Sequence, residues 1–166
     1  KIKMEKKGIH FPIISVKSIN YEQHKIFMKY TSGIYLKYSI EILEILCKKS
    51  IYENKAKTLH KSIHFLLQIL YNSGNNILLS NYDLLILICF YFGLITIEIH
   101  TKLPNITKLK LIYPEKFSFY SNKTINEIEV ICIKLLDYNI NVITAYDYLC
   151  DLFKNNIEFI KKPKDI

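Results

Sequence analysis

The sequence contains no arginine and no tryptophan. All 23 of its basic residues are lysine, and with 15 acidic residues the formal net charge is +8. A positive charge permits contact with nucleic acid or with an acidic partner. Arginine, however, is the residue suited to bidentate recognition of bases and phosphates, and the lysines are spread along the chain. This pattern favours a solvated surface over a nucleic-acid patch.

Glycine is scarce as well, and the four glycines are too widely spaced to form a phosphate-binding loop. No Gly-x-Ser-x-Gly motif and no paired-carboxylate signature occur. His60 and His64 are four residues apart, but Lys-Ser-Ile lies between them, without the glutamate of a His-Glu-x-x-His zinc motif. We therefore expect no enzymatic activity, no catalytic residues, no metal site and no cofactor.

The four cysteines are far apart, and none forms a Cys-x-x-Cys pair. Zinc binding and dithiol redox chemistry therefore have no supporting spacing. Each cysteine lies in an apolar run, which predicts buried free thiols in a reducing compartment and hence a nuclear or cytoplasmic location. These residues are Cys47, Cys89, Cys132 and Cys150.

The longest apolar run is Leu84 to Ile97, bracketed by Asp83 and Glu98. It falls short of the roughly twenty residues that a helix needs to cross a bilayer, so we expect no membrane contact. A helix that is apolar on all sides and too short to span a membrane is typical of the centre of a helical domain. Ser80 and Asp83 have the spacing of a capping box at its start. The chain is thus predicted to be one all-α domain with this segment as its most buried helix.

Other helices follow from apolar residues at helical spacing and from turn-forming residues between them. We expect Thr58, Ser80, Thr124 and Thr144 to lie within one or two residues of helix starts, and Thr144 to form a capping box with Asp147. Pro104 is expected in the first turn of a short helix that ends before Pro114. The predicted helices cover residues 21–30, 36–48, 58–71, 83–98, 104–113, 124–136 and 144–153.

One motif in the last third of the chain resembles a known family. A helix containing Glu129 is followed by Leu-Leu-Asp-Tyr-Asn-Ile-Asn-Val (135–142) and by a Thr-x-Tyr-Asp-Tyr-Leu helix start at Thr144. This order is similar to the end of a cyclin box. Residues 57–60, 82–94, 103–112 and 124–136 are similar in order and spacing to its second, third, fourth and fifth helices.

The resemblance implies a five-helix cyclin box at residues 33–140 around a buried central helix. An N-terminal extension with a short helix (1–32) would precede it, and a further helix with a basic tail (141–166) would follow. The 13 residues after Phe153 are too few for a second box, so the chain is similar in extent to the single-box P-type cyclins or is the front half of a longer protein, and the single box is the reading we favour. The Met-Arg-Ala-Ile-Leu docking motif of cell-cycle cyclins has no match between Ile34 and Ile45.

Cyclins grip the C-helix of a cyclin-dependent protein kinase with their third and fifth helices and so complete its phosphoryl-transfer site. Glu129 matches the family's glutamate in the fifth helix, but Thr96 stands where the family has a lysine in the third, with Lys102 as a possible substitute. The resemblance implies a partner-binding surface made of Ile26, Phe27, Thr96, Ile97, Glu129, Ile133, Tyr138 and Ile140.

Two other functions fit the sequence. The charge permits a cyclin-fold scaffold of the transcription machinery that resembles the TFIIB family and binds DNA or polymerase. A helical interaction module with an accidental similarity to cyclins is the third possibility. A lysine cluster on one face would favour the transcription scaffold, whereas an apolar stripe between the third and fifth helices would favour the kinase regulator.

Overall fold

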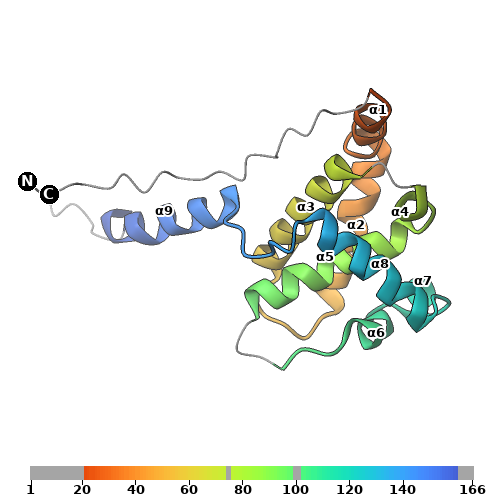
Figure 1. Cartoon of the computed structure of the whole chain (residues 1–166). Helices are drawn as coiled ribbons and strands as arrows, with labels where there is room; N and C mark the ends of the chain where they lie inside the picture. The colour runs from red at the N-terminus through yellow and green to blue at the C-terminus, as the bar shows by residue number, and fades with distance from the viewer. Residues whose placement is uncertain (1–20, 74–75, 99–101, 161–166) are drawn as a thin grey trace, which may run out of the picture.

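A computed structural model describes residues 21–73, 76–98 and 102–160, and every regular element in these ranges is helical (Figure 1). The predicted all-α class is therefore confirmed. Residues 1–20 of the expected N-terminal extension and residues 161–166 of the expected basic tail lie outside the described residues. The elements are α1 Tyr21–Tyr30, α2 Gly33–Lys49, α3 Lys55–Asn72, α4 Asn76–Ser80, α5 Tyr82–Ile97, α6 Ile106–Leu109, the 3-10 helix η1 Lys110–Ile112, α7 Pro114–Phe117, α8 Asn122–Leu135 and α9 Ala145–Ile160.

Helix α5 forms the centre of the fold. All residues from Leu84 to Phe90 are buried, and α2, α3, α4, α6, α7 and α8 all contact this helix. A helix that is apolar around its whole circumference is stable in water only when neighbours cover each side. The prediction that this segment is the most buried helix is confirmed within the described chain. No helix among the described residues is long and apolar enough to cross a membrane.

Gly93 permits α3 and α5 to approach each other closely. A Cβ atom at this position would lie 2.5 Å from Ser62 Oγ and 2.9 Å from the carbonyl oxygen of Thr58. Phe92, its neighbour in sequence, packs edge-to-face on Phe65 with ring centroids 6.1 Å apart. The C-terminal half of α5 therefore lies against the N-terminal half of α3, and glycine is the residue that fits the crossing point.

The predicted helix starts agree with the structure in three of four cases. Thr144 immediately precedes α9, and Ser80 and Thr124 lie within two residues of the first residues of α5 and α8. The prediction for Thr58 is wrong, because α3 begins three residues earlier, at Lys55. Lysine and alanine at 55–57 are good helix formers and extend the helix toward its N-terminus.

Asp83 does not act as the capping residue that the sequence indicated. Ser80 ends the short helix α4, and Asn81 is the N-cap residue of α5, without a side-chain capping bond. The Asp83 carboxylate instead accepts a hydrogen bond from Tyr38 Oη at 2.6 Å and lies 3.4 Å from Lys116 Nζ. A long-range partner has replaced the local one, so this carboxylate ties α2, α5 and α7 together.

The region around the two prolines also differs from the prediction. Pro104 lies before α6 and not in its first turn, because Asn105 is the N-cap residue and accepts a hydrogen bond from the Thr107 amide at 3.0 Å. The helical stretch of α6 and η1 ends at Ile112, before Pro114, as predicted, but Pro114 then opens a further helix, the single turn α7. A fixed φ and a missing N–H suit proline to the first position of a helix.

Three of the four cysteine thiols are buried, as predicted, and Cys150 is half-buried. Burial raises the pKa of Cys47 to about 11 and that of Cys132 to about 12, and it places the pKa of Cys89 well above its usual value. Burial penalises the thiolate, so these three side chains act as small apolar core residues.

Candidate partner-binding site

The residues predicted to contact a partner come from α1, α5, α8 and the segment that follows α8. Helices α5 and α8 pack against each other. Burial raises the pKa of Tyr91 of α5, and the charge of Glu129 of α8 raises it further. The two side chains are therefore close enough to interact. This pair marks where the two helices meet at the surface.

Glu129 is half-buried, and burial raises the pKa of its carboxyl group above the ordinary value. It forms no ion pair with any residue that the structure describes, whereas Glu127 on the same helix is exposed and lies 3.9 Å from Lys123 Nζ. A carboxylate withdrawn from water without a counter-ion is an unfavourable arrangement in the isolated chain. A binding partner that brings a donor or a cation would remove that cost.

The backbone after α8 presents Tyr138 to solvent. The amide of Tyr138 donates a hydrogen bond to the carbonyl oxygen of Ile133 at 2.9 Å, and Asp137 and Tyr138 have φ values of 53° and 57°. A non-glycine residue in this left-handed region carries strain of about 1 kcal/mol. The Tyr138 side chain is nevertheless 65 % exposed. A strained backbone that exposes a large aromatic side chain is an arrangement suited to binding.

Ile133 and Ile140 connect this part of the chain to the core. Both side chains are half-buried and pack against the core. The segment between them follows α3, because Asn72 Nδ2 at one end donates to the carbonyl oxygen of Leu135 at 2.9 Å and Lys61 at the other donates to the carbonyl oxygen of Val142. These two α3 residues are about 16 Å apart along the helix. Glu129 and Ile133 lie one turn apart on α8, and Tyr138 is bonded to Ile133, so these three residues lie near one another, with Ile140 two residues further along the chain.

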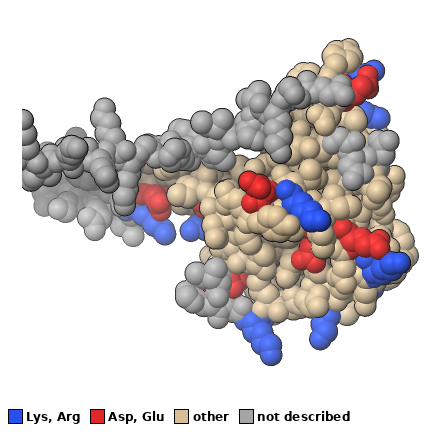
Figure 2. Space-filling model, in the orientation of Figure 1, with Lys and Arg blue, Asp and Glu red and all other residues tan. Residues whose placement is uncertain are grey.

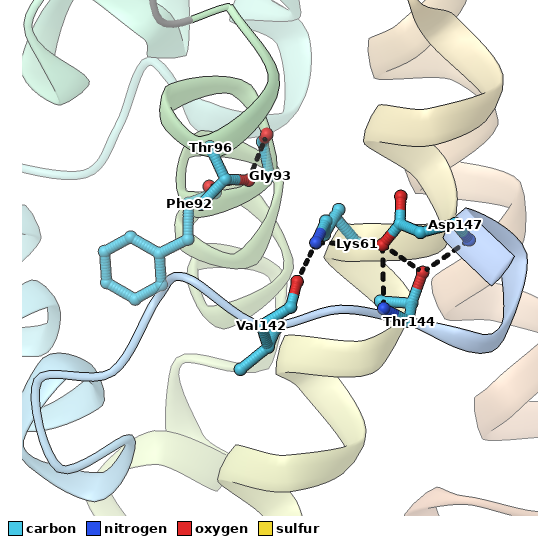
Figure 3. A network of polar contacts seen from close by, with 7 residues as sticks. All are labelled: Lys61, Phe92, Gly93, Thr96, Val142, Thr144 and Asp147. Carbon is cyan, nitrogen blue, oxygen red and sulfur yellow. Dashed lines mark hydrogen bonds and ion pairs between the residues drawn. The ribbon is translucent and has the colours of Figure 1, made fainter. Parts of the chain in front are cut away.

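Thr96 and Ile97 lie at the C-terminal end of α5, and both are half-buried. The Thr96 hydroxyl donates to the carbonyl oxygens of Phe92 at 3.1 Å and Gly93 at 2.8 Å, so it is engaged with its own helix (Figure 3). It cannot offer a partner the charge of a lysine. Lys102, the possible substitute, is exposed.

Ile26 and Phe27 occupy a different part of the molecule. Helix α1 packs on α2 and α3, and the Phe27 ring meets Tyr71 edge-to-face with centroids 5.3 Å apart. Tyr71 is near the C-terminal end of α3, whereas Thr58, which adjoins Gly93, is near its N-terminal end. The α1 pair and the Thr96–Ile97 pair therefore lie toward opposite ends of α3, and Phe27 serves to attach α1 to the core.

A buried polar group that the sequence did not reveal joins α3 to the start of α9. We call it the Lys61 cluster; its members are Lys61, Val142, Thr144 and Asp147 (Figure 3). Lys61 is only 7 % exposed, donates to the Val142 carbonyl oxygen and lies 3.0 Å from Asp147 Oδ2. The capping box is formed in both directions, since the Thr144 amide donates to Asp147 Oδ2 at 2.7 Å and the Asp147 amide donates to Thr144 Oγ1 at 3.3 Å.

The Lys61 cluster stabilises the ionised form of Asp147. Burial alone would raise the pKa of Asp147, but the Thr144 amide and the Lys61 ammonium together hold it below the ordinary value. Beside the cluster, the His60 ring stacks on Tyr146 at 4.2 Å. One signal in the sequence could have indicated a buried lysine: Lys61 lies on the same helical stripe as the buried residues Thr58 and Phe65.

Helix α9 extends away from the helical body beyond this attachment (Figure 1). Three of its large apolar side chains remain at the surface: Leu149, Leu152 and Phe153 are each more than half exposed. Among the residues that the structure describes, no group of three histidine, cysteine, aspartate or glutamate side chains could hold a metal ion. Comparison of the chain with protein-family models, with curated proteins and with solved structures gave no match.

Proposed function

We propose that this chain is a cyclin-like regulatory subunit that binds a cyclin-dependent protein kinase and activates it. The contact surface would be formed by α5, α8 and the residues after α8. The observation that carries the proposal is the half-buried carboxylate of Glu129, which has no ion-pair partner in the described part of the chain, together with the exposed Tyr138 that follows α8. A charge held partly out of water and next to an exposed aromatic side chain is suited to an interface whose partner supplies the missing hydrogen-bond donors.

The order and packing of the helices also support the proposal. A long apolar helix, α5, is covered by α2 and α3 before it in the chain and by α6 and α8 after it. This order is compatible with the five-helix arrangement that the sequence resembles. Regulation in that arrangement needs no catalytic group on the regulator, because the kinase's own lysine and glutamate pair when its C-helix is rotated inward.

Thr96 sets a limit on the contacts available at the far end of this surface. Its hydroxyl is bonded to its own helix, so the cationic contact made by a lysine at this position is missing. Binding would then depend on Glu129, Ile133 and Tyr138. We infer that the partner contact is centred on α8 and the loop after it, with Ile97 at its edge.

A transcription scaffold that binds DNA or polymerase is the second candidate, favoured by the net charge of +8. The distribution of the charges supports it less well. On the face seen in Figure 2, acidic and basic side chains lie among each other. Two lysines, Lys37 and Lys123, are paired within their helices with Glu41 and Glu127. A nucleic-acid surface would gather unpaired cations on one face.

The test uses a charge reversal with a matched control on the same helix. Glu129→Lys, combined with Tyr138→Ala, should abolish co-purification of cyclin-dependent kinases from the source organism and weaken binding of a purified kinase by at least ~tenfold. Glu127→Lys makes the same charge change two residues away, at an exposed position. It should leave binding within about twofold, because rim charges contribute little.

Circular dichroism and thermal unfolding should show that all three proteins are folded. If the folded double variant binds every such kinase as the wild type does, the kinase-facing surface is wrong. If no kinase binds the wild type while duplex DNA does so with a strong salt dependence, the transcription scaffold replaces the kinase regulator.

A further inference from the structure

The segment that joins α8 to α9 has the burial pattern of a single β-strand. Residues 139–144 belong to no helix. Their burial alternates, because the even-numbered residues from 140 to 144 are half-buried or buried and the odd-numbered residues from 139 to 143 are exposed. A period of two is that of an extended chain, whose successive side chains point to opposite faces. The segment is therefore one extended strand that lies on the helical body.

One edge of this strand is occupied by α3. Lys61 donates a hydrogen bond to the carbonyl oxygen of Val142 (Figure 3). In an extended chain the N–H and the C=O of one residue point to the same edge, and those of the next residue point to the opposite edge. Asn141 and Ile143, the neighbours of Val142, therefore direct their backbone groups to the edge that faces away from Lys61.

The backbone groups at this second edge have no partner within the described chain. Neither the amides nor the carbonyl oxygens of Asn141 and Ile143 form a hydrogen bond with any described residue. The amide of Asn139, just before them, donates to the carbonyl oxygen of Leu136 at 3.0 Å. Two donors and two acceptors therefore remain on a stretch of three residues, and an unpaired strand edge is a template for another extended chain.

The pattern of these groups indicates the kind of ligand. Donors and acceptors that alternate at strand spacing are matched by the main chain of an extended peptide, as in β-strand addition. The Ile143 side chain is 60 % exposed, and a β-branched residue of the peptide opposite it would cover it. A second copy of this chain fits less well, because a stable dimer buries about 800 Å² on each partner, which is more than so short an edge provides.

We propose that the 139–143 edge binds an extended segment of a partner protein, which adds to it as a second strand. The edge is fixed before the peptide arrives, since Asn72 holds the Leu135 carbonyl on one side and Lys61 holds that of Val142. A fixed edge reduces the entropy cost of binding. The inference goes beyond the proposed kinase contact, because the groups that recognise the peptide are backbone amides and carbonyls and not the Glu129 carboxylate.

The experiment titrates the full chain with the synthetic peptide acetyl-Glu-Thr-Val-Thr-Val-Thr-Lys-amide and follows the backbone amides by NMR. The peptide is neutral overall and consists mainly of strand-forming residues. A second peptide has the same side chains but carries N-methyl groups on its five central residues, so their N–H donors are missing. The first peptide should bind saturably, with its largest shifts at Asn141 and Ile143. It should bind at least ~tenfold more tightly than the second, which is the effect of losing two backbone hydrogen bonds.

Two variants of one residue provide the matched control. Asn141→Pro removes an amide that has no partner in the described chain, at an exposed position whose extended backbone suits proline. It should weaken binding of the unmodified peptide by ~tenfold, whereas Asn141→Ala keeps the amide and should bind as the wild type does. Glu129→Lys should leave peptide binding unchanged even where it abolishes kinase binding, so the two proposals fail separately.

Four results would each overturn the proposal. They are equal binding of the two peptides by the wild type, no saturable binding, peptide binding that a folded Asn141→Pro protein retains in full, and shifts centred outside residues 139–143. Sedimentation of the wild type covers the other occupant. A dimer that Asn141→Pro dissociates, without peptide binding, would assign the 139–143 edge to a second copy of the chain.

Discussion

Lys61 and Glu129 are both charged side chains withdrawn from water, Lys61 almost completely and Glu129 by about half. Within the described chain, only Lys61 has a counter-ion. Asp147 lies 3.0 Å from the Lys61 ammonium, and the Val142 carbonyl oxygen accepts a hydrogen bond from it. Glu129 has Tyr91 beside it and no cation among the described residues. The Lys61 cluster therefore contains both charges of its ion pair, whereas Glu129 has no counter-ion in the described chain.

The difference agrees with a structural role for the Lys61 cluster and with the binding role proposed for Glu129. Burying a charge is tolerated when the partner is part of the fold, and the Lys61 cluster meets that condition while attaching α9. An unpaired half-buried carboxylate reduces stability in the isolated chain. A donor or cation supplied by another molecule, as proposed above, would remove that cost. The predictions below test this division, from the largest expected effect to the smallest.

The largest effect is expected from Asp147→Ala. It leaves the Lys61 ammonium buried with one carbonyl oxygen and without its counter-ion. Removing one member of a buried pair costs ~3 kcal/mol or more in the free energy of unfolding. Urea denaturation followed by circular dichroism measures the change.

The double variant Lys61→Met, Asp147→Ala is the control for this prediction. It removes the buried charge as well as its partner, so most of the lost stability should return. A single variant as stable as the wild type would show that the Lys61 cluster does not depend on charge pairing.

Acidification should weaken the same cluster. The pKa of Asp147 is lowered in the folded chain, so its contribution to stability is present above the unfolded-state pKa. It is lost as the pH falls through the lower, folded value, that is, below about pH 4. Stability measured from pH 6 to pH 3 should therefore fall more steeply in the wild type than in the Lys61→Met, Asp147→Ala protein. Parallel curves would contradict the shift.

A smaller effect is expected from Tyr138→Gly, in the segment that follows α8. Glycine adopts the φ of 57° without strain, which favours the folded state, but its greater freedom when unfolded offsets part of the gain. We expect a stabilisation of under ~1 kcal/mol together with weaker kinase binding. A variant that is less stable than the wild type would show that the exposed ring contributes to folding.

The smallest effect is expected from Glu129→Gln. Burial raises the pKa of Glu129, so the ionised carboxylate lowers stability at neutral pH, and that cost disappears as the pH falls through the folded pKa toward the unfolded one. Because the residue is partly solvated, the gain from glutamine should be under ~1 kcal/mol at pH 7 and absent near pH 4. Equal stability at both pH values would place Glu129 in fully solvated surroundings.

The sequence was informative where local patterns determine structure. The apolar run that became α5 has one stable environment, and the Thr144–Asp147 capping box is a contact within three residues, so both could be predicted. Helix α1 has the predicted bounds. The short helices α4 and α7 could not be predicted, because a single turn has too few residues to show a period.

Long-range contacts explain the remaining failures. The bond between Lys61 and Val142 joins residues that are 81 positions apart, and Asp83 exchanged a predicted local role for Tyr38, which is 45 residues away. The cavity at the N-terminal end of α5 likewise collects its walls from three separate segments, at residues 34–38, 79–83 and 120. No local pattern records such a partner. Lys61 could still have been singled out, because a lysine on the buried stripe of a helix needs an anion.

The three buried cysteines can serve as reporters of local unfolding. A thiol reacts with alkylating reagents only as the thiolate and only where the reagent can reach it, and Cys47, Cys89 and Cys132 have raised pKa values and buried side chains. Cys89 on α5 and Cys132 on α8 should therefore become labelled only when the helices around α5 separate, whereas half-buried Cys150 on α9 reports on the C-terminal helix. Mass spectrometry of timed labelling would then rank how readily each part of the chain opens, without any substitution.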